Sequence, residues 1–337
     1  MGTNDQTSPQ RLINRLASLG VLLVLVIVTV SATIRLSGAG LGCAAWPDCY
    51  GRIGSGLQQT GSPSDRAAPP MNGARLTHRI TTTAAGVLIL ALAFICMSQR
   101  PVPRRETAIA LTLLGLAVGL AVLGRWTPDA RLPAVALGNL LGGLTMLALF
   151  WWLHSLTNPA ASIRLPHAGK LKPWARIGLL LLVAQIVLGG LVSAKFAALS
   201  CTTLPDCQGT WWPGQWSSSS FNPFLEYAVG PTGTIAATPA AASLHMAHRY
   251  GAVLVACYLV WLGLRAVRLD RLNRDYRRLG WTVLVLVVAQ VSLGMTAVGM
   301  SLPLWVVIAH NATAALLLLA LISLNVALSP ARRLFSA

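Results

Sequence analysis

Two histidines, His248 and His310, are the residues whose type and position most clearly indicate chemistry in this chain. Each stands in a long apolar run, at a similar distance from the start of that run. An ionisable side chain surrounded by hydrocarbon is costly unless it faces a partner, so such residues usually mark a functional site. Neutral imidazole is the commonest metal ligand in proteins, and axial histidines hold haem iron. The pair therefore predicts a haem site with two histidine ligands.

The residues around this pair allow more than one interpretation. The two imidazoles could instead form hydrogen bonds between helices, as polar side chains do in membranes. Arg249 directly follows His248 and could pair with a haem propionate or extend to the lipid headgroups. His245 lies three residues before His248, on the same helical face. It fits an alternative ligand, a residue that supports a ligand, or a polar residue at the start of a helix.

The composition of the 337 residues is that of an integral membrane protein. Hydrophobic side chains make up 55% and charged ones 10%, whereas roughly a quarter of the residues of soluble domains are charged. Eight apolar runs reach the length of about 20 residues that a bilayer requires. We therefore expect an all-α fold of eight transmembrane helices. The runs begin near Ala17, Leu76, Ala108, Pro133, Ile177, Ser243, Trp281 and Leu304.

The net charge of +17 follows the expected topology and does not indicate a nucleic-acid partner. Seventeen of the 26 Lys and Arg lie in the tails and in every second loop, which is the positive-inside pattern. We therefore expect a bacterial inner-membrane protein, in contact with lipid, with both termini in the cytoplasm and the long loops on the outer face. The basic segments are Arg11 with Arg15, 100–105, 164–176, 265–278, and Arg332 with Arg333.

Two of the expected outer loops carry the same cysteine pattern. Cys43 and Cys49 have the spacing of Cys201 and Cys207, and both loops close with Pro-Asp-Cys. A plain disulfide in each would contribute about 2 to 3 kcal/mol by restricting the unfolded chain. The alternative is a redox-active pair, because strained or exposed disulfides are the labile ones.

The histidines repeat along the chain as well. His78 precedes His248 by 170 residues, each is followed by an arginine, which is Arg79 in the first half, and Asn139 precedes His310 by 171 residues. We therefore expect two four-helix bundles related by duplication. Because asparagine is a poor iron ligand, the first half would hold iron through His78 and leave the other axial position open or loosely filled. An open position suits chemistry at a porphyrin, and it is equally what decay after duplication would leave.

The charge and hydropathy patterns also set the expected boundaries. Cytoplasmic tails occupy 1–15 and 329–337, the two halves occupy 16–158 and 177–328, and a cytoplasmic linker occupies 159–176. Carboxylates are scarce in the apolar runs, so paired acid and base chemistry within the membrane is not expected. This excludes proton pumps and most transporters.

Several segments together resemble the heme A synthase family, and the resemblance covers nearly the whole chain. They are Gly40-Leu41-Gly42-Cys43 with Trp46-Pro47 and Cys49, Leu141-Gly142-Gly143, His245-Met246-Ala247-His248-Arg249, and Pro303-Leu304-Trp305 with His310-Asn311-Ala312. The resemblance implies haem b bound in the C-terminal half and haem O received by the N-terminal half. It implies oxidation of the C8 methyl of haem O to the formyl of haem A, for cytochrome oxidase. Candidate partners are haem O synthase and oxidase assembly factors.

Two positions in the first half depart from the family pattern. Arg75 stands where the family has a glutamate assigned to catalysis, and Asn139 stands where it has a second histidine. The catalytic residue is therefore unassigned, and Arg75 could instead neutralise a substrate propionate. Our leading hypothesis is a haem-oxidising enzyme in which Cys43 and Cys49 serve the substrate half and haem b relays electrons.

Two other classes compete with this hypothesis. One is a non-catalytic haem-binding or haem-handling accessory protein, which Arg75 and Asn139 favour. The other is a diheme electron-transfer cytochrome, which would need two complete histidine pairs, so the substitution at position 139 argues against it.

Overall fold

The computed structural model describes residues 8–38, 70–126, 132–158, 166–214, 216–226, 239–269 and 274–329. Eight long helices dominate this part of the chain, and each is long and apolar enough to cross a membrane. The all-α class is thereby confirmed for the described residues, as are eight helices that are long and apolar enough to span a membrane. The helices are α1 (Ser8–Gly38), α3 (Pro70–Ser98), α4 (Arg104–Trp126), α5 (Pro133–Thr157), α6 (Lys172–Ala194), α7 (Pro239–Leu269), α8 (Arg274–Gly299) and α9 (Leu304–Ala327).

Most helices extend beyond the apolar runs that predicted them. Helix α1 begins at Ser8, well before the run at Ala17, and α6 begins at Lys172, inside the range expected for the linker. A helical backbone satisfies its own hydrogen bonds, so a helix can continue past the hydrocarbon at no loss. Proline begins several helices, Pro133 among them, because the first turn does not use its backbone N–H groups.

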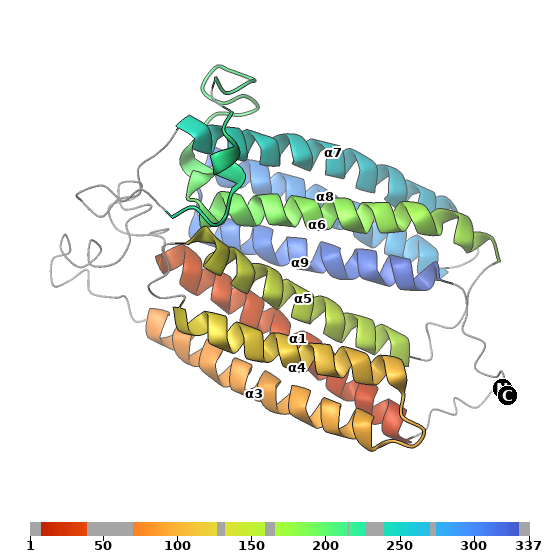
Figure 1. Cartoon of the computed structure of the whole chain (residues 1–337). Coiled ribbons are helices and arrows are strands. Elements are labelled where there is room, and N and C mark those ends of the chain that lie inside the picture. Colours follow the sequence, from red (N-terminus) through yellow and green to blue (C-terminus); the bar gives the residue numbers. More distant parts are fainter. Residues whose placement is uncertain are drawn as a thin grey trace.

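The eight helices form two groups of four that lie side by side (Figure 1). In the first group, α1 and α4 each contact both α3 and α5. In the second group, α6 and α8 each contact both α7 and α9. Helices α3 and α5 therefore occupy opposite corners of the first group, and α7 and α9 occupy opposite corners of the second. The two groups meet through α1 and α5 on one side and α6 and α9 on the other.

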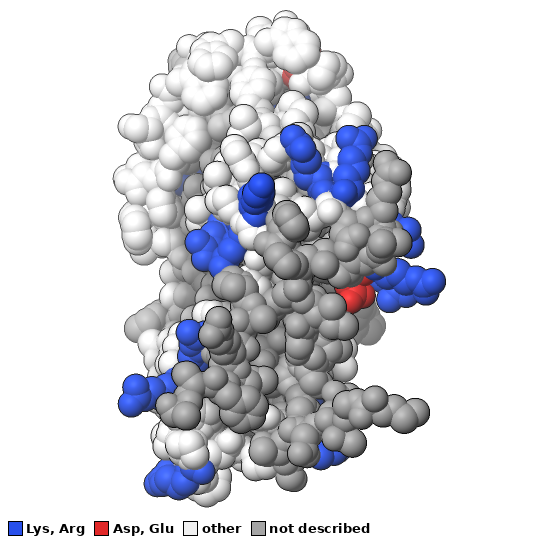
Figure 2. Space-filling view, turned by 90° about the vertical axis from the view of Figure 1, so that its right-hand side faces the viewer, with Lys and Arg blue, Asp and Glu red and all other residues white. Residues whose placement is uncertain are grey.

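The two ends of this bundle differ in their charge. One end, here called the disulfide end, is where α6 ends, α7 begins and the loop with Cys201 and Cys207 lies. At the other end, here called the basic end, α1 and α6 begin and α9 ends. Lys and Arg gather over the basic end, with few acidic residues among them (Figure 2). The described basic residues there are Arg11, Arg15, Arg100, Arg104, Arg105, Lys170, Lys172, Arg176, Arg265, Arg268, Arg274, Arg277 and Arg278.

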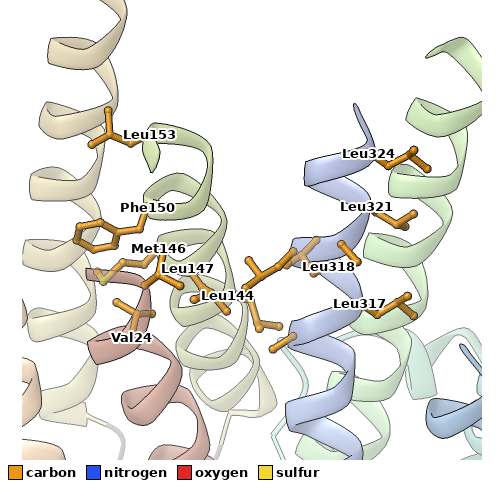
Figure 3. Close-up of a cluster of buried hydrophobic side chains, with 14 of the residues drawn as sticks. Val24, Leu144, Met146, Leu147, Phe150, Leu153, Leu317, Leu318, Leu321 and Leu324 are labelled. Carbon is orange, nitrogen blue, oxygen red and sulfur yellow. The ribbon is translucent and has the colours of Figure 1, made fainter. Parts of the chain in front are cut away.

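The largest apolar core among the described residues contains side chains of both groups of helices. Figure 3 shows its residues on α5 and α9, which continue along these helices to Leu153 and Leu324. Phe150 and Leu153 of α5 are fully buried, as are Leu321 and Leu324 of α9. The ring of Phe150 lies where a side chain at Gly20 would stand, so α1 and α5 pack closely. The histidines lie nearer the disulfide end, where smaller apolar clusters and polar contacts replace this core.

Candidate haem site

His248 of α7 lies against α6, which contacts it in two ways. The side-chain Nε2 of Gln185 lies 2.9 Å from the ring Nδ1 of His248 and donates to the carbonyl oxygen of His248 at 2.8 Å. One turn further along α6, a Cβ at Gly189 would lie 2.8 Å from the ring Cε1. Only glycine leaves room for the imidazole there. The imidazole therefore lies between the side-chain amide of Gln185 and the backbone of α6 at Gly189.

His310 of α9 has the same arrangement against α8. The side-chain Nε2 of Gln290 lies 3.1 Å from the ring Nε2 of His310. A Cβ at Gly294, one turn further along α8, would lie 3.2 Å from the ring Cε1. Both supporting helices carry the pattern Ala-Gln-x-x-Leu-Gly, at 184–189 and at 289–294. Sequence reasoning missed the two glutamines, although this repeated pattern was a signal that could have found them.

The two histidines belong to helices at opposite corners of the second group. Among the described residues, several buried polar atoms around them have no hydrogen-bond partner. Such an atom costs about 1 to 3 kcal/mol when it stays unsatisfied, so their concentration in one place indicates a polar ligand. They are Oε1 of Gln185, Oε1 of Gln290, Nδ1 of His310, Nδ1 of His245 and Nε of Arg249.

These features fit an axially ligated haem. The hydrogen bonds of His248 use Nδ1 and the backbone, and within the described residues its Nε2 makes none. His310 likewise has one nitrogen beside Gln290 and one buried without a partner. No cluster of three or more metal-ligating side chains occurs in the described part of the chain. A pair of imidazoles is sufficient for haem iron, because the porphyrin supplies the remaining ligands.

Arg249 holds the disulfide loop. Its NH1 donates to the carbonyl oxygens of Thr203 and Asp206, at 2.8 and 2.7 Å, and its NH2 donates to that of Cys201 at 2.7 Å. Neither of the roles expected from the sequence, a propionate partner or a contact with lipid headgroups, accounts for these bonds. The Nε of Arg249 is buried and has no hydrogen-bond partner among the described residues, so it is a donor that an acidic group of a ligand could use.

Cys201 and Cys207 form the disulfide expected between them. Further contacts fasten this loop to the bundle: the hydroxyl of Tyr250 donates to the carbonyl of Trp211, and the ring of Trp212 stacks over Tyr250. At the end of α6, Lys195 Nζ donates to the carbonyl of Ser219, and partial burial lowers the pKa of this amine. The loop therefore covers the disulfide end of α7, beside the histidines.

Replacing Arg249 by leucine should expose the Cys201–Cys207 disulfide to reductant. A hydrogen bond to a charged group contributes about 1.5 to 3 kcal/mol, so the loss of even one should speed reduction by at least about tenfold. The rate is measured by mass-tagging the freed thiols during timed treatment with dithiothreitol. Arg79→Leu is the matched control, because Arg79 occupies the repeated position in α3 and is exposed. Equal rates in both variants would contradict the role assigned to Arg249.

The first group of helices carries the predicted residues His78 and Asn139. His78 is half-buried in α3, where the hydroxyls of Thr81 and Thr82 donate to its carbonyl oxygen. Asn139 is half-buried in α5, at the opposite corner of the group. Helices α3 and α5 thus occupy the positions in the first group that α7 and α9, with His248 and His310, occupy in the second.

The basic residues of α3 and the first cysteine pair complete the predicted set. Arg75 and Arg79 are exposed on α3, and Arg79 lines an open hollow with Ile80, Thr83 and Ala84. Cys43 and Cys49 lie outside the described residues. A role for these positions therefore stays a prediction.

Residues 14–322 match the model of the COX15-CtaA family, described as cytochrome oxidase assembly protein. The chain belongs to this family. Among its relatives, the Heme A synthase of Shewanella oneidensis is 33% identical over 310 residues, which is 89% of this chain and 92% of that protein. The Heme A synthase of Methylobacterium nodulans is 30% identical, over 88% of this chain and 86% of that protein. The resemblance that the sequence motifs indicated is therefore confirmed for this COX15-CtaA member.

Proposed function

We propose that this membrane protein oxidises the C8 methyl of haem O to the formyl of haem A, and that a resident haem b in the second half serves the reaction. The observation that carries the proposal is the pair of imidazoles on opposite corners of the second group, near buried polar atoms that have no hydrogen-bond partner among the described residues. The relatives that share the family are named Heme A synthase, which supports the same reaction.

His248 and His310 are the proposed axial ligands of haem b. When bound, this haem supplies one-electron transfer. The glycines at 189 and 294 leave the space that each ring occupies, and Arg249 Nε is placed to donate to a propionate. The large apolar core, which runs on toward the basic end, helps to keep water away from the helices that hold the ligands.

The first group of helices is the proposed substrate half, related to the second by duplication. His78 would bind the iron of haem O or a related porphyrin, and Arg79 would face its acidic groups. Arg75 and Asn139, which replace the family's glutamate and histidine, would leave the other side of that porphyrin less firmly held. These two residues favour the second candidate function, an accessory protein that binds haem without oxidising it.

We infer the orientation from the charge of the two ends. Lys and Arg gather at the basic end, which the positive-inside rule places in the cytoplasm of a bacterial cell (Figure 2). Both termini would then be cytoplasmic, and the disulfide loop would face the oxidising side, where disulfides persist. Haem O synthase and oxidase assembly factors remain proposed partners.

Supplying haem O to membranes that contain the protein tests the reaction. We expect haem A or its hydroxylated intermediate in the extracted pigments, and a loss of at least tenfold in His78→Ala. Membranes without the protein give the background. Retained haem b with no oxidised product would contradict the enzymatic proposal and support the accessory protein.

A further inference from the structure

The two glutamines beside the histidines occupy the remaining corners of the second group of helices. Gln185 lies on α6 and Gln290 on α8, whereas the histidines lie on α7 and α9. Each glutamine directs its carboxamide at one imidazole, at 2.9 Å for His248 and 3.1 Å for His310. In order around the group, the four helices thus alternate between one that carries an imidazole and one that carries a carboxamide.

The pattern that carries these glutamines belongs to the second half alone. Residues 1–158 contain no Ala-Gln-x-x-Leu-Gly segment, and the first half also lacks the second histidine. The carboxamides therefore accompany the complete histidine pair. A polar residue that only joined helices would have no reason to be confined to the half with two imidazoles.

The chemistry of a ligated imidazole requires such a neighbour. When one ring nitrogen binds iron, the other carries a proton, and an acceptor for this N–H fixes the ring and strengthens it as a ligand. A carboxamide has an oxygen acceptor as well as N–H donors. The Oε1 atoms of Gln185 and Gln290 are both buried, and neither has a hydrogen-bond partner among the described residues. A half-turn of either carboxamide would offer its oxygen to an imidazole N–H. For Gln185, this turn would exchange the bond to the carbonyl oxygen of His248 for one to the ring.

We propose that Gln185 and Gln290 are positioning residues that hold the imidazoles of His248 and His310 for iron and set the donor strength of both rings. This inference rests on the proposed haem site. In this structure Gln185 also donates to the carbonyl oxygen of His248, so it contacts both the ring and the backbone of the helix that carries it.

Leucine and glutamate substitutions test this proposal on the purified holoprotein. Gln185→Leu and Gln290→Leu should each release haem to apomyoglobin about 10 to 100 times faster, the range typical for loss of such a partner. Their midpoint potentials should rise, because a weaker donor stabilises ferric iron less. Gln185→Glu and Gln290→Glu keep an acceptor, so they should retain haem and shift the potential the opposite way.

Asn325→Leu is the matched control. Asn325 of α9 donates from its side-chain amide to the carbonyl oxygen of Ala175 in α6, so it also joins two helices of this group. It lies toward the basic end, and its loss should leave the potential and the haem release unchanged.

Two results would overturn the proposal, and they are distinguishable. Leucine variants that match Asn325→Leu in potential and in haem release would overturn the role of the glutamines alone. A wild-type protein without a bis-histidine haem would overturn the proposed haem site, and this inference with it. The glutamate variants guard against misfolding, because a change of potential in a protein that retains haem reports on the bond itself.

Discussion

Replacing His310 by alanine should abolish the low-spin spectrum of the resident haem, whereas His78→Ala should leave that spectrum largely intact. His310 is one of two proposed axial ligands on opposite corners of the second group, and an alanine cannot bind iron. His78 belongs to the first group and is only half-buried. The measurement is the reduced-minus-oxidised spectrum of the purified protein, together with the haem content per chain.

The His78 variant is also the control for this experiment, since it removes the same side chain at the repeated position. Equal loss of the spectrum in both variants would show that the two halves have been assigned wrongly. An unchanged spectrum in His310→Ala would exclude His310 as a ligand.

Replacing Gly189 by valine should remove the haem as completely as loss of a ligand does. Even a Cβ at this position would lie 2.8 Å from Cε1 of His248, which is closer than such atoms approach. Because Gly189 lies within α6, which packs against α7, neither the backbone nor the imidazole can move away without disturbing the contact between these helices. Haem content and the low-spin spectrum again give the measurement.

Gly115→Val is the matched control, because a Cβ at this exposed position of α4 would meet nothing within 4 Å. It should keep the full haem content. Gly294→Val should fall between the two, since its Cβ would lie 3.2 Å from His310 and a small shift could relieve it. A Gly189 variant with normal haem would contradict the position of the ring against α6.

The sequence predicted the membrane fold well because one property decides it. A chain in hydrocarbon must satisfy its backbone internally, so each sufficiently long apolar run becomes a helix. The exact ends were less predictable, as the early start of α1 at Ser8 shows. The two histidines could be singled out because ionisable residues are rare in such runs, and the structure places their helices at opposite corners of one group.

Other parts of the site could not be read from the sequence. A glutamine in an apolar helix usually joins neighbouring helices. The repeated Ala-Gln-x-x-Leu-Gly pattern therefore marks Gln185 and Gln290 without showing that they lie beside the imidazoles. The partners of Arg249 are backbone carbonyl oxygens of the disulfide loop. Every residue has such an oxygen, so residue types do not show which of them accept a hydrogen bond. Both features depend on how distant segments meet in space.

The unsatisfied carboxamide oxygens of Gln185 and Gln290 bear on how much of the protein accumulates when its proposed porphyrin is scarce. These oxygens are buried, and no described residue donates a hydrogen bond to them. A porphyrin that binds only the native bundle adds to its stability by mass action, and chains that fold less completely are removed by cellular proteases. The amount of this protein that a membrane retains should therefore follow the tetrapyrrole supply of the cell.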